Sequence, residues 1–186
     1  LLCVNTAKSG GESRVASSVT LYNEMLKRRP ELVADLCEDF FWTKHGEFSP
    51  GEDPWYKLPV FSFTGDRFSA KGASTHARKA QDLPGAERWS ALRNEAVDLF
   101  QELVPDLAAD LPFQQGDLQI LNSHVTLHSR RPYEDWAEPD RKRHLYRLWI
   151  ENEDLRPLPD IVRRNLKGVV LGGYVPRAPL DAEEAA

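Results

Sequence analysis

The chain has 186 residues, and its 24 lysines and arginines against 29 aspartates and glutamates give a formal net charge of −5 at pH 7. A mildly acidic chain with interspersed charges is a poor candidate for binding a nucleic-acid backbone, and no apolar run approaches the roughly 18 residues that suggest a membrane span. The two cysteines, Cys3 and Cys37, form no Cys-x-x-Cys pattern. This excludes a disulfide framework and a zinc ribbon and favours a reducing, cytoplasmic setting.

The first residues indicate an apolar strand over residues 1–7, without the basic stretch and cleavage site of a signal peptide. A polar, glycine-rich turn follows at residues 8–13. Because the strand is already under way at the first residue, we expect residues 1–186 to be a single domain, or part of one, that continues from a longer protein.

Helical spacing of apolar residues comes next along the chain. Helices are expected over residues 19–29, 31–38 and 88–104. Pro30 supports the start of the second helix, because the N–H group that proline lacks is not needed in a first helical turn.

Extended segments alternate with these helices. Thr64-Gly65-Asp66 predicts a hairpin turn between strands at 60–63 and 67–70, whereas residues 43–56 have the composition of a surface loop. The remaining expected elements are strands over residues 118–127 and 143–150 and a weaker helix over residues 159–166. Several strands around a few helices are typical of an α+β fold, mainly β, with an antiparallel sheet.

The strand expected at residues 118–127 leads into a histidine. Side chains alternate between the faces of a strand, so Asn122, His124 and His128 would share one face, opposite to Val125 and Leu127. An imidazole at a strand end can bind a metal through one nitrogen while the other is held in place. By itself the spacing favours a plainer interpretation, in which His128 is a structural or surface residue.

A second metal hypothesis places His124 and His128 four residues apart on a helix, as in zinc hydrolases. Val125 stands where such sites carry their glutamate base, and the segment is better suited to a strand. This hypothesis is therefore the weaker of the two.

Two arginines, Arg143 and Arg147, lie four residues apart in the next expected strand, which separates them by roughly 13 Å. Large apolar residues lie on both faces of this segment, and an arginine on a buried strand needs an anionic partner. A small-molecule dianion could be that partner, because a guanidinium can hold a carboxylate with two hydrogen bonds. The alternative partners are nearby acidic residues of the chain: Glu134, Asp135 and Asp140.

These segments, GDLQILNSHVTLHSR at residues 116–130 and RHLYRLW at residues 143–149, resemble the C-terminal signature of taurine dioxygenase-like (TauD/TfdA) enzymes. The turn Gly10-Gly11-Glu12-Ser13 is similar to the family's Gly-Gly-acid-Thr turn, and LPVF at residues 58–61 is similar to its mid-chain strand. The resemblance implies a double-stranded β-helix, or jelly roll, with flanking helices. Residues 1–186 would be the C-terminal part of that domain, incomplete at its N-terminus.

The resemblance also implies the site residues. His128 matches the distal histidine of a two-histidine, one-carboxylate Fe(II) site. Arg143 and Ser13 match the residues that hold the far carboxylate of 2-oxoglutarate, and Arg147 matches a second arginine that reaches toward substrate or cosubstrate. Two more side chains are candidates for substrate binding: Asn122 and Arg78.

The family's His-x-Asp motif, which carries the other two iron ligands, is absent from the chain and would fall upstream of Leu1. His45-Gly46-Glu47 is the one histidine followed two residues later by an acid. It lies after the Gly-Gly-Glu-Ser turn in loop-like sequence, and we interpret it as a surface segment.

The resemblance thus implies an Fe(II)- and 2-oxoglutarate-dependent dioxygenase that uses O₂ to oxidise a C–H bond of a small organic molecule and releases succinate and CO₂. An anionic substrate is one of the options. No catalytic residue beyond the metal site is expected. Residues 43–56 and 71–87 are candidate covers for the site. The alternatives are a jelly-roll binding protein that has lost iron and the zinc hydrolase described above. Neither nucleic acid nor a membrane is expected as a partner, and a homo-oligomer is left open.

Overall fold

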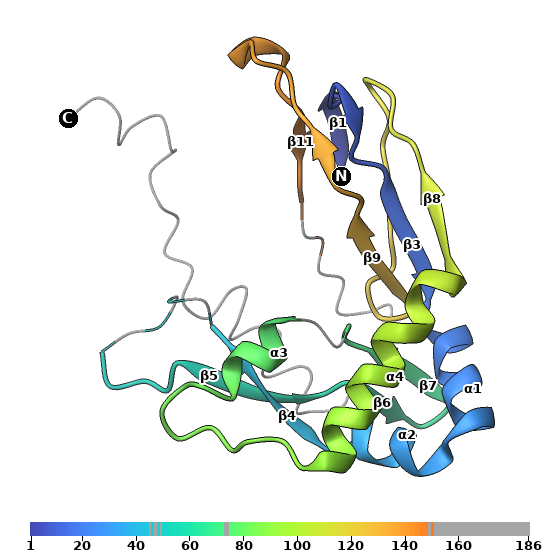
Figure 1. Cartoon of the computed structure of the whole chain (residues 1–186), viewed down its shortest axis with the longest axis vertical. Helices are drawn as coiled ribbons and strands as arrows, with labels where there is room; N and C mark the ends of the chain where they lie inside the picture. Colours follow the sequence, from blue (N-terminus) through green and yellow to red (C-terminus); the bar gives the residue numbers. More distant parts are fainter. Residues whose placement is uncertain (45, 47, 49, 73–74, 149, 151–186) are drawn as a thin grey trace.

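The computed structural model describes residues 1–44, 46, 48, 50–72, 75–148 and 150. The helix expected at residues 159–166 lies outside the described residues, as do His45 and Glu47. Figure 1 shows two regions: strands β1, β3, β8, β9 and β11 gather at one end, and the helices with β4–β7 form a lobe at the other. None of the helices in the described ranges combines the length and the apolar character needed to cross a bilayer.

The helices confirm most of the helical expectations. The α-helices are α1 (Ser18–Arg28), α2 (Pro30–Leu36), α3 (Thr75–Ala80) and α4 (Ala91–Leu107), and Pro139–Arg141 form a short 3₁₀-helix. Helix α4 begins later than expected because the side chain of Ser90 accepts a hydrogen bond from the backbone N–H of Arg93 and so caps the helix there. It also continues past Pro105.

The lobe contains two antiparallel strand pairs. They are β4 (Asp39–Thr43) with β5 (Trp55–Pro59), and β6 (Phe61–Thr64) with β7 (Arg67–Ala70). The second pair confirms the predicted hairpin. The first corrects the expected loop at residues 43–56, because Thr43 pairs with Trp55 and both ends of that segment are strand.

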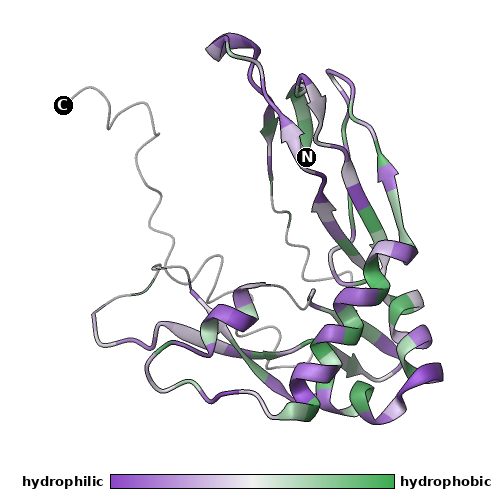
Figure 2. Ribbon diagram, viewed as in Figure 1, coloured by the Kyte–Doolittle hydropathy of each residue, from purple (hydrophilic) through white to green (hydrophobic). Residues whose placement is uncertain are grey.

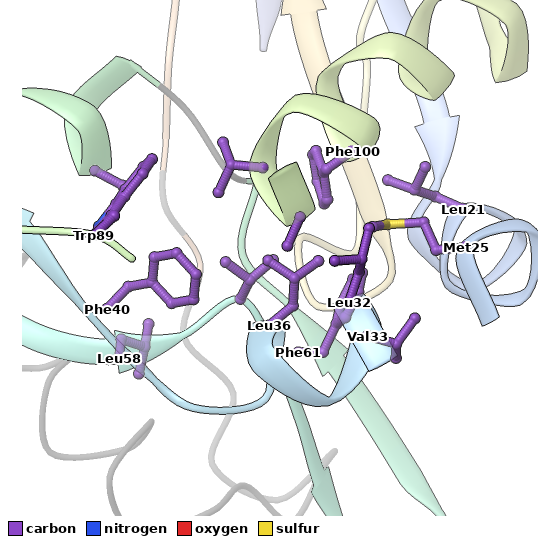
Figure 3. Packing of buried hydrophobic residues seen from close by; sticks show 14 of the residues in the cluster. Leu21, Met25, Leu32, Val33, Leu36, Phe40, Leu58, Phe61, Trp89 and Phe100 are labelled. Atoms are coloured by element: carbon purple, nitrogen blue, oxygen red, sulfur yellow. The ribbon is translucent and has the colours of Figure 1, made fainter. Parts of the chain in front are cut away.

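The hydrophobic core lies almost entirely in this lobe. Side chains from α1, α2, α4 and the lobe strands converge on it, as Figure 3 shows for Leu21, Met25, Leu36, Phe40 and Phe61 among others. The aromatic members meet mostly edge to face or tilted, an arrangement that rings favour over face-to-face stacking. The core therefore anchors the lobe from which the strands at the other end emerge.

Those strands form two layers. In the first layer, β1 (Leu2–Asn5) pairs with β11 (His144–Tyr146) on one side and with residues 116–119 on the other. In the second, β3 (Ser13–Ser17) lies between β8 (Ala108–Leu111) and β9 (Thr126–Arg130). The short strands β2 (Ser9–Gly10) and β10 (Tyr133–Glu134) continue the register of β3 and β9.

Two of the strand predictions need correction. Only the last residues of the expected strand at 118–127 belong to β9, because residues 123–125 form a turn in which the carbonyl of Asn122 accepts from the N–H groups of Val125 and Thr126. Asn122, His124 and His128 therefore do not share one strand face. The helical zinc hypothesis is also wrong, since His128 lies in a strand and His124 in the turn. Strand β11 is shorter than the expected strand at 143–150.

Candidate functional site

The two strand layers are joined by a buried hydroxyl. Ser13, only 3% exposed, lies in β3, and its Oγ donates a hydrogen bond to Oε1 of Gln119 at 3.0 Å. Gln119 belongs to the other layer, because its N–H and C=O pair with the backbone of Leu1. Ser13 therefore faces the space between the layers.

His128 lies on the same face of its layer as Ser13. It sits opposite Val15 in the β3–β9 ladder, and Val15 is two residues from Ser13, so the three side chains point the same way. The imidazole of His128 has a pKa below its usual value, first because it loses water, then because of the charges of Arg147 and the Leu1 ammonium group. Both charges belong to the other layer. A lowered pKa favours the neutral imidazole, which is the form that binds metals.

Arg143 makes a third connection between the layers. It immediately precedes β11, is half-buried, and donates from Nη2 to the carbonyl oxygen of Gly11 at 3.2 Å. Its guanidinium also lies over the ring of Tyr133, with Cζ 5.4 Å from the ring centroid. Within the described part of the chain, no carboxylate forms an ion pair with Arg143.

The acidic residues nearest in sequence have other partners. Glu134 forms an ion pair with Lys8. A carboxylate oxygen of Asp135 accepts from the backbone N–H groups of Trp136 and Arg143, the latter at 2.8 Å, and not from a guanidinium. Among the described residues, Glu134 and Asp135 therefore do not pair with the guanidinium of Arg143, and no ion pair joins it to Asp140.

The Gly10-Gly11 turn allows this close approach. Both glycines have positive φ angles, +70° and +80°. A Cβ on Gly10 would lie 2.3 Å from the carbonyl oxygen of Pro132, and a Cβ on Gly11 would lie 3.0 Å from Nε of Arg143. Any larger residue would push these partners away, so the turn is fitted to the arginine.

The interactions of the two arginines with the second layer lie at the two ends of one region between the layers. Arg147 acts on His128 at one end, and Arg143 contacts Gly11 at the other. Arg147 comes four residues after Arg143. Val15, which lies opposite His128, comes four residues after Gly11. At the rise of a strand both spacings are roughly 13 Å, so they match. The structure thus brings Ser13, His128, Arg143 and Arg147 into one region.

The other two predicted residues are engaged elsewhere. Arg78 lies on α3, forms an ion pair with Asp98 of α4, and stacks over Trp89. Asn122 is exposed, and its Oδ1 accepts from the backbone N–H of His124 within the turn. None of the contacts described for Arg78 involves the inter-layer region.

Sequence reasoning missed Gln119 and Tyr133. Gln119 lies within the family-like segment at residues 116–130, which the sequence predicts only as extended. Tyr133 lies in the charged connection that follows this segment. The hydrogen bond of Gln119 with Ser13 and the backbone pairing of Tyr133 with Gly10 join segments more than a hundred residues apart in sequence, and no local pattern encodes that.

The described residues of the inter-layer region are better suited to bind a carboxylate than to hold a metal ion. His128 can supply one nitrogen ligand, but among the described residues no three His, Cys, Asp or Glu side chains cluster closely enough to hold a metal ion. A carboxylate fits better, because Arg143 offers donors and Ser13 a hydroxyl. A pocket of about 370 Å³ borders Gln119 and is lined by residues 111–113 and 117–121, without His128 or Arg143.

Comparisons with known proteins identify relatives of the chain. The chain is 33% identical over 169 residues to FR-33289 synthase of Streptomyces rubellomurinus, which covers 86% of the chain and 48% of that protein. It is 29% identical over 161 residues to the taurine hydroxylase-like protein SAT17 of Stachybotrys chartarum, which covers 83% of the chain and 40% of that protein. The chain therefore spans less than half the length of either curated relative.

A solved structure shows the shared fold. An asparagine oxygenase, in complex with Fe(II), 2S,3S-3-hydroxyasparagine and succinate, superposes with a TM-score of 0.52 and 20% identity over 76% of this chain and 41% of its own. The family model described as taurine catabolism dioxygenase TauD, TfdA family matches residues 1–149. With most of its length matched, the chain belongs to the TauD, TfdA family of dioxygenases.

Proposed function

We propose that this chain is the C-terminal part of a jelly-roll domain that acts as an Fe(II)- and 2-oxoglutarate-dependent dioxygenase. The enzyme oxidises a C–H bond of a small organic molecule and releases succinate and CO₂. The observation that carries the proposal is the half-buried guanidinium of Arg143, which contacts a carbonyl and a ring but no carboxylate of the described residues. A guanidinium that has partly lost water and lacks an anionic partner is less stable than a paired one, and a dianionic cosubstrate would supply that partner.

Arg143 and Ser13 bind the far carboxylate of 2-oxoglutarate in this proposal. A guanidinium presents several N–H donors in a plane, so Arg143 can keep its bond to Gly11 and still hold a carboxylate. The hydroxyl of Ser13 has one donor hydrogen and two acceptor lone pairs. It can turn its hydrogen from Gln119 to the carboxylate while the amide of Gln119 turns to donate in its place. Arg147 lies near the metal end, where it can attract an anionic group of cosubstrate or substrate.

His128 supplies one imidazole ligand to Fe(II), and its lowered pKa keeps that imidazole neutral near pH 7. The bound iron, with 2-oxoglutarate and O₂, would supply the oxidising chemistry. The described residues do not provide the other two ligands, which the proposal assigns to a His-x-Asp motif outside them. The role of the chain is to place the cosubstrate and to shield the reaction from water, in a cytoplasmic enzyme. Asn122 stays a proposed substrate contact, and Arg78 a weaker one.

The direct test is succinate formation by the intact protein with Fe(II), ascorbate, 2-oxoglutarate and O₂. The unmodified protein should form succinate at least slowly without substrate, and His128→Ala or Arg143→Ala should reduce this to background. Arg141→Ala is the matched control, since Arg141 is exposed, pairs with Glu138 and should keep its activity. Unchanged succinate release in the His128→Ala protein would refute the iron role.

One observation favours a second candidate, a jelly-roll binding protein without iron. His128 is not accompanied by two further metal ligands among the described residues. This candidate predicts that the purified intact protein contains no iron by elemental analysis and binds 2-oxoglutarate without consuming it. Bound iron at one equivalent per chain would exclude it.

A further inference from the structure

Tyr133 lies between two guanidinium groups. The Cζ atom of Arg130 is 4.3 Å from the centroid of the Tyr133 ring, and that of Arg143 is 5.4 Å away. Both distances are within the roughly 6 Å over which a cation is attracted to an aromatic face. Arg130 is the last residue of β9, two residues after His128, whereas Arg143 immediately precedes β11. The ring therefore connects the strand of His128 with the arginine of the other layer.

The backbone holds this ring in place. Tyr133 pairs with Gly10 in the β2–β10 ladder, which continues the register that places Val15 opposite His128. The N–H of Gly11 donates to the carbonyl of Pro132 at 3.1 Å, directly before the tyrosine. The antiparallel ladder thus fixes the backbone of Tyr133 relative to that of His128, and the two guanidinium contacts orient its partly exposed ring.

Arg143 is confined on its other sides as well. Its Nη2 donates to the carbonyl of Gly11, and Gly11 leaves space for Nε only because it lacks a Cβ. The backbone N–H of Arg143 donates to Asp135. With the ring against its guanidinium, Arg143 cannot easily move along the inter-layer region.

We propose that Tyr133 is a positioning residue that fixes the separation between Arg143 and His128 and thereby selects the length of the diacid that spans them. This inference rests on the function proposed above. A 2-oxo diacid that would be held by one end at the metal site of His128 and by the other at Arg143 must match a set distance. Each additional methylene lengthens the diacid, and a confined guanidinium cannot retreat to accept it.

Binding of two diacids to the intact protein tests this inference. Dissociation constants for 2-oxoglutarate and for 2-oxoadipate, which is one methylene longer, are measured by calorimetry with Mn(II) and without O₂. Tyr133→Leu should weaken 2-oxoglutarate binding about 3- to 30-fold, as expected for loss of a cation–π contact. It should weaken 2-oxoadipate binding less, so that the preference between the two narrows. Tyr133→Phe keeps the ring and should stay within about twofold of the unmodified protein.

Trp136→Leu is the matched control. It removes a guanidinium–aromatic contact of the same kind, in which Cζ of Arg141 lies 3.5 Å from the Trp136 ring centroid, but this contact does not involve Arg143. Both affinities should be unchanged in this variant. Should the leucine variant fail to fold by circular dichroism, Tyr133→Val, which suits a strand, replaces it.

The outcomes separate the two proposals. Normal 2-oxoglutarate binding by the unmodified protein, with the same affinities and the same preference in the Tyr133→Leu variant, overturns the role of Tyr133 and leaves the proposed function intact. An unmodified protein that binds neither diacid overturns both. A narrowed preference in Tyr133→Leu alone supports the positioning role.

Discussion

At the scale of single residues, the two adjacent glycines of the turn meet different requirements. The missing Cβ of Gly10 leaves room for the backbone carbonyl of Pro132, whereas the missing Cβ of Gly11 leaves room for the side chain of Arg143. A backbone atom in a ladder cannot move aside as easily as the end of a flexible side chain. The first glycine is therefore needed for the fold, and the second for the arginine.

The Gly10→Ala substitution should accordingly destabilise the protein more than Gly65→Ala. Both glycines have positive φ angles, +70° and +58°, which costs a larger residue about 1–2 kcal/mol. Only at Gly10 would the new Cβ meet an atom, the carbonyl oxygen of Pro132 at 2.3 Å, and overpacking adds about 1–3 kcal/mol. Urea unfolding curves measure the difference. Equal losses for the two variants would show that the ladder yields to the added methyl group.

Site residues could be predicted where a motif names them, and not where tertiary pairing creates them. Ser13, His128 and Arg143 were identified through a family resemblance, and the structure brings them to one region. Arg78 had a suitable charge, but its pairing with Asp98 depends on how α3 packs against α4. Asn122 was assigned to a strand face, although its side chain bonds to the backbone two residues later and makes a turn.

At the scale of elements, one carboxylate ties together the three strands of the second layer. Asp110 in β8 accepts hydrogen bonds from Nε and Nη2 of Arg131, just after β9, and forms an ion pair with Arg14 in β3. Its pKa is lowered, chiefly by the hydrogen bonds from Arg131. A group whose pKa is lower in the folded state stabilises the fold above its unfolded pKa, near 3.9 for aspartate, and that contribution is lost as the pH falls through the folded pKa.

The Asp110→Asn variant should therefore be less stable than the unmodified protein at pH 6, and the difference should shrink toward pH 3. Urea midpoints across this range measure it. Asp66→Asn is the control, because Asp66 is highly exposed and its one ion pair among the described residues is with the adjacent Arg67, at 3.4 Å. A difference that stays constant between pH 6 and pH 3 would contradict the role of the ionised carboxylate.

Helices and the short hairpin could be predicted from sequence because their signals are local: apolar spacing, a proline at a first turn, and a glycine in a tight turn. Strand β11 lies within the strand expected at residues 143–150, whereas the residues of β8 carry little alternation of their own, and the pairing partners of neither strand could be predicted. Both find those partners far along the chain, β8 in β3 and β11 in β1. Local patterning cannot encode such pairing.

At the scale of the whole molecule, the stable core and the candidate site lie in different places. The buried cluster occupies the lobe, whereas the strand layers carry exposed apolar side chains such as Leu118, Ile120 and Leu148. Figure 2 shows hydrophobic and hydrophilic residues interspersed along both the lobe helices and the strands of the layers. Burial of apolar surface is the main stabilising term, so the lobe should be the more stable region.

Hydrogen exchange of the 186-residue chain should reveal this gradient. Amides in the middle of α1 and α4, whose inner faces are buried, should exchange most slowly, and those of β11 should exchange faster by at least about tenfold, as expected for regions of lower local stability. Mass spectrometry of peptides after timed exchange measures it. Equal protection of β11 and α4 would mean that the layers unfold together with the core.

The unbroken register between residues 9–17 and 126–134 has a consequence for how the protein assembles. These two paired segments flank residues 18–125 of the chain. The N–H of Ser18 donates to the carbonyl of Val125 at 3.0 Å, so the two ends of that intervening segment lie side by side. Long-range pairing of this kind is slow until the intervening chain has become compact. We therefore expect the lobe to form first and to bring its own two ends together. The pairing between residues 9–17 and 126–134 then forms one residue pair after another, starting at the lobe. A mutation deep in the lobe would then disrupt the region between the strand layers without changing any of its own residues.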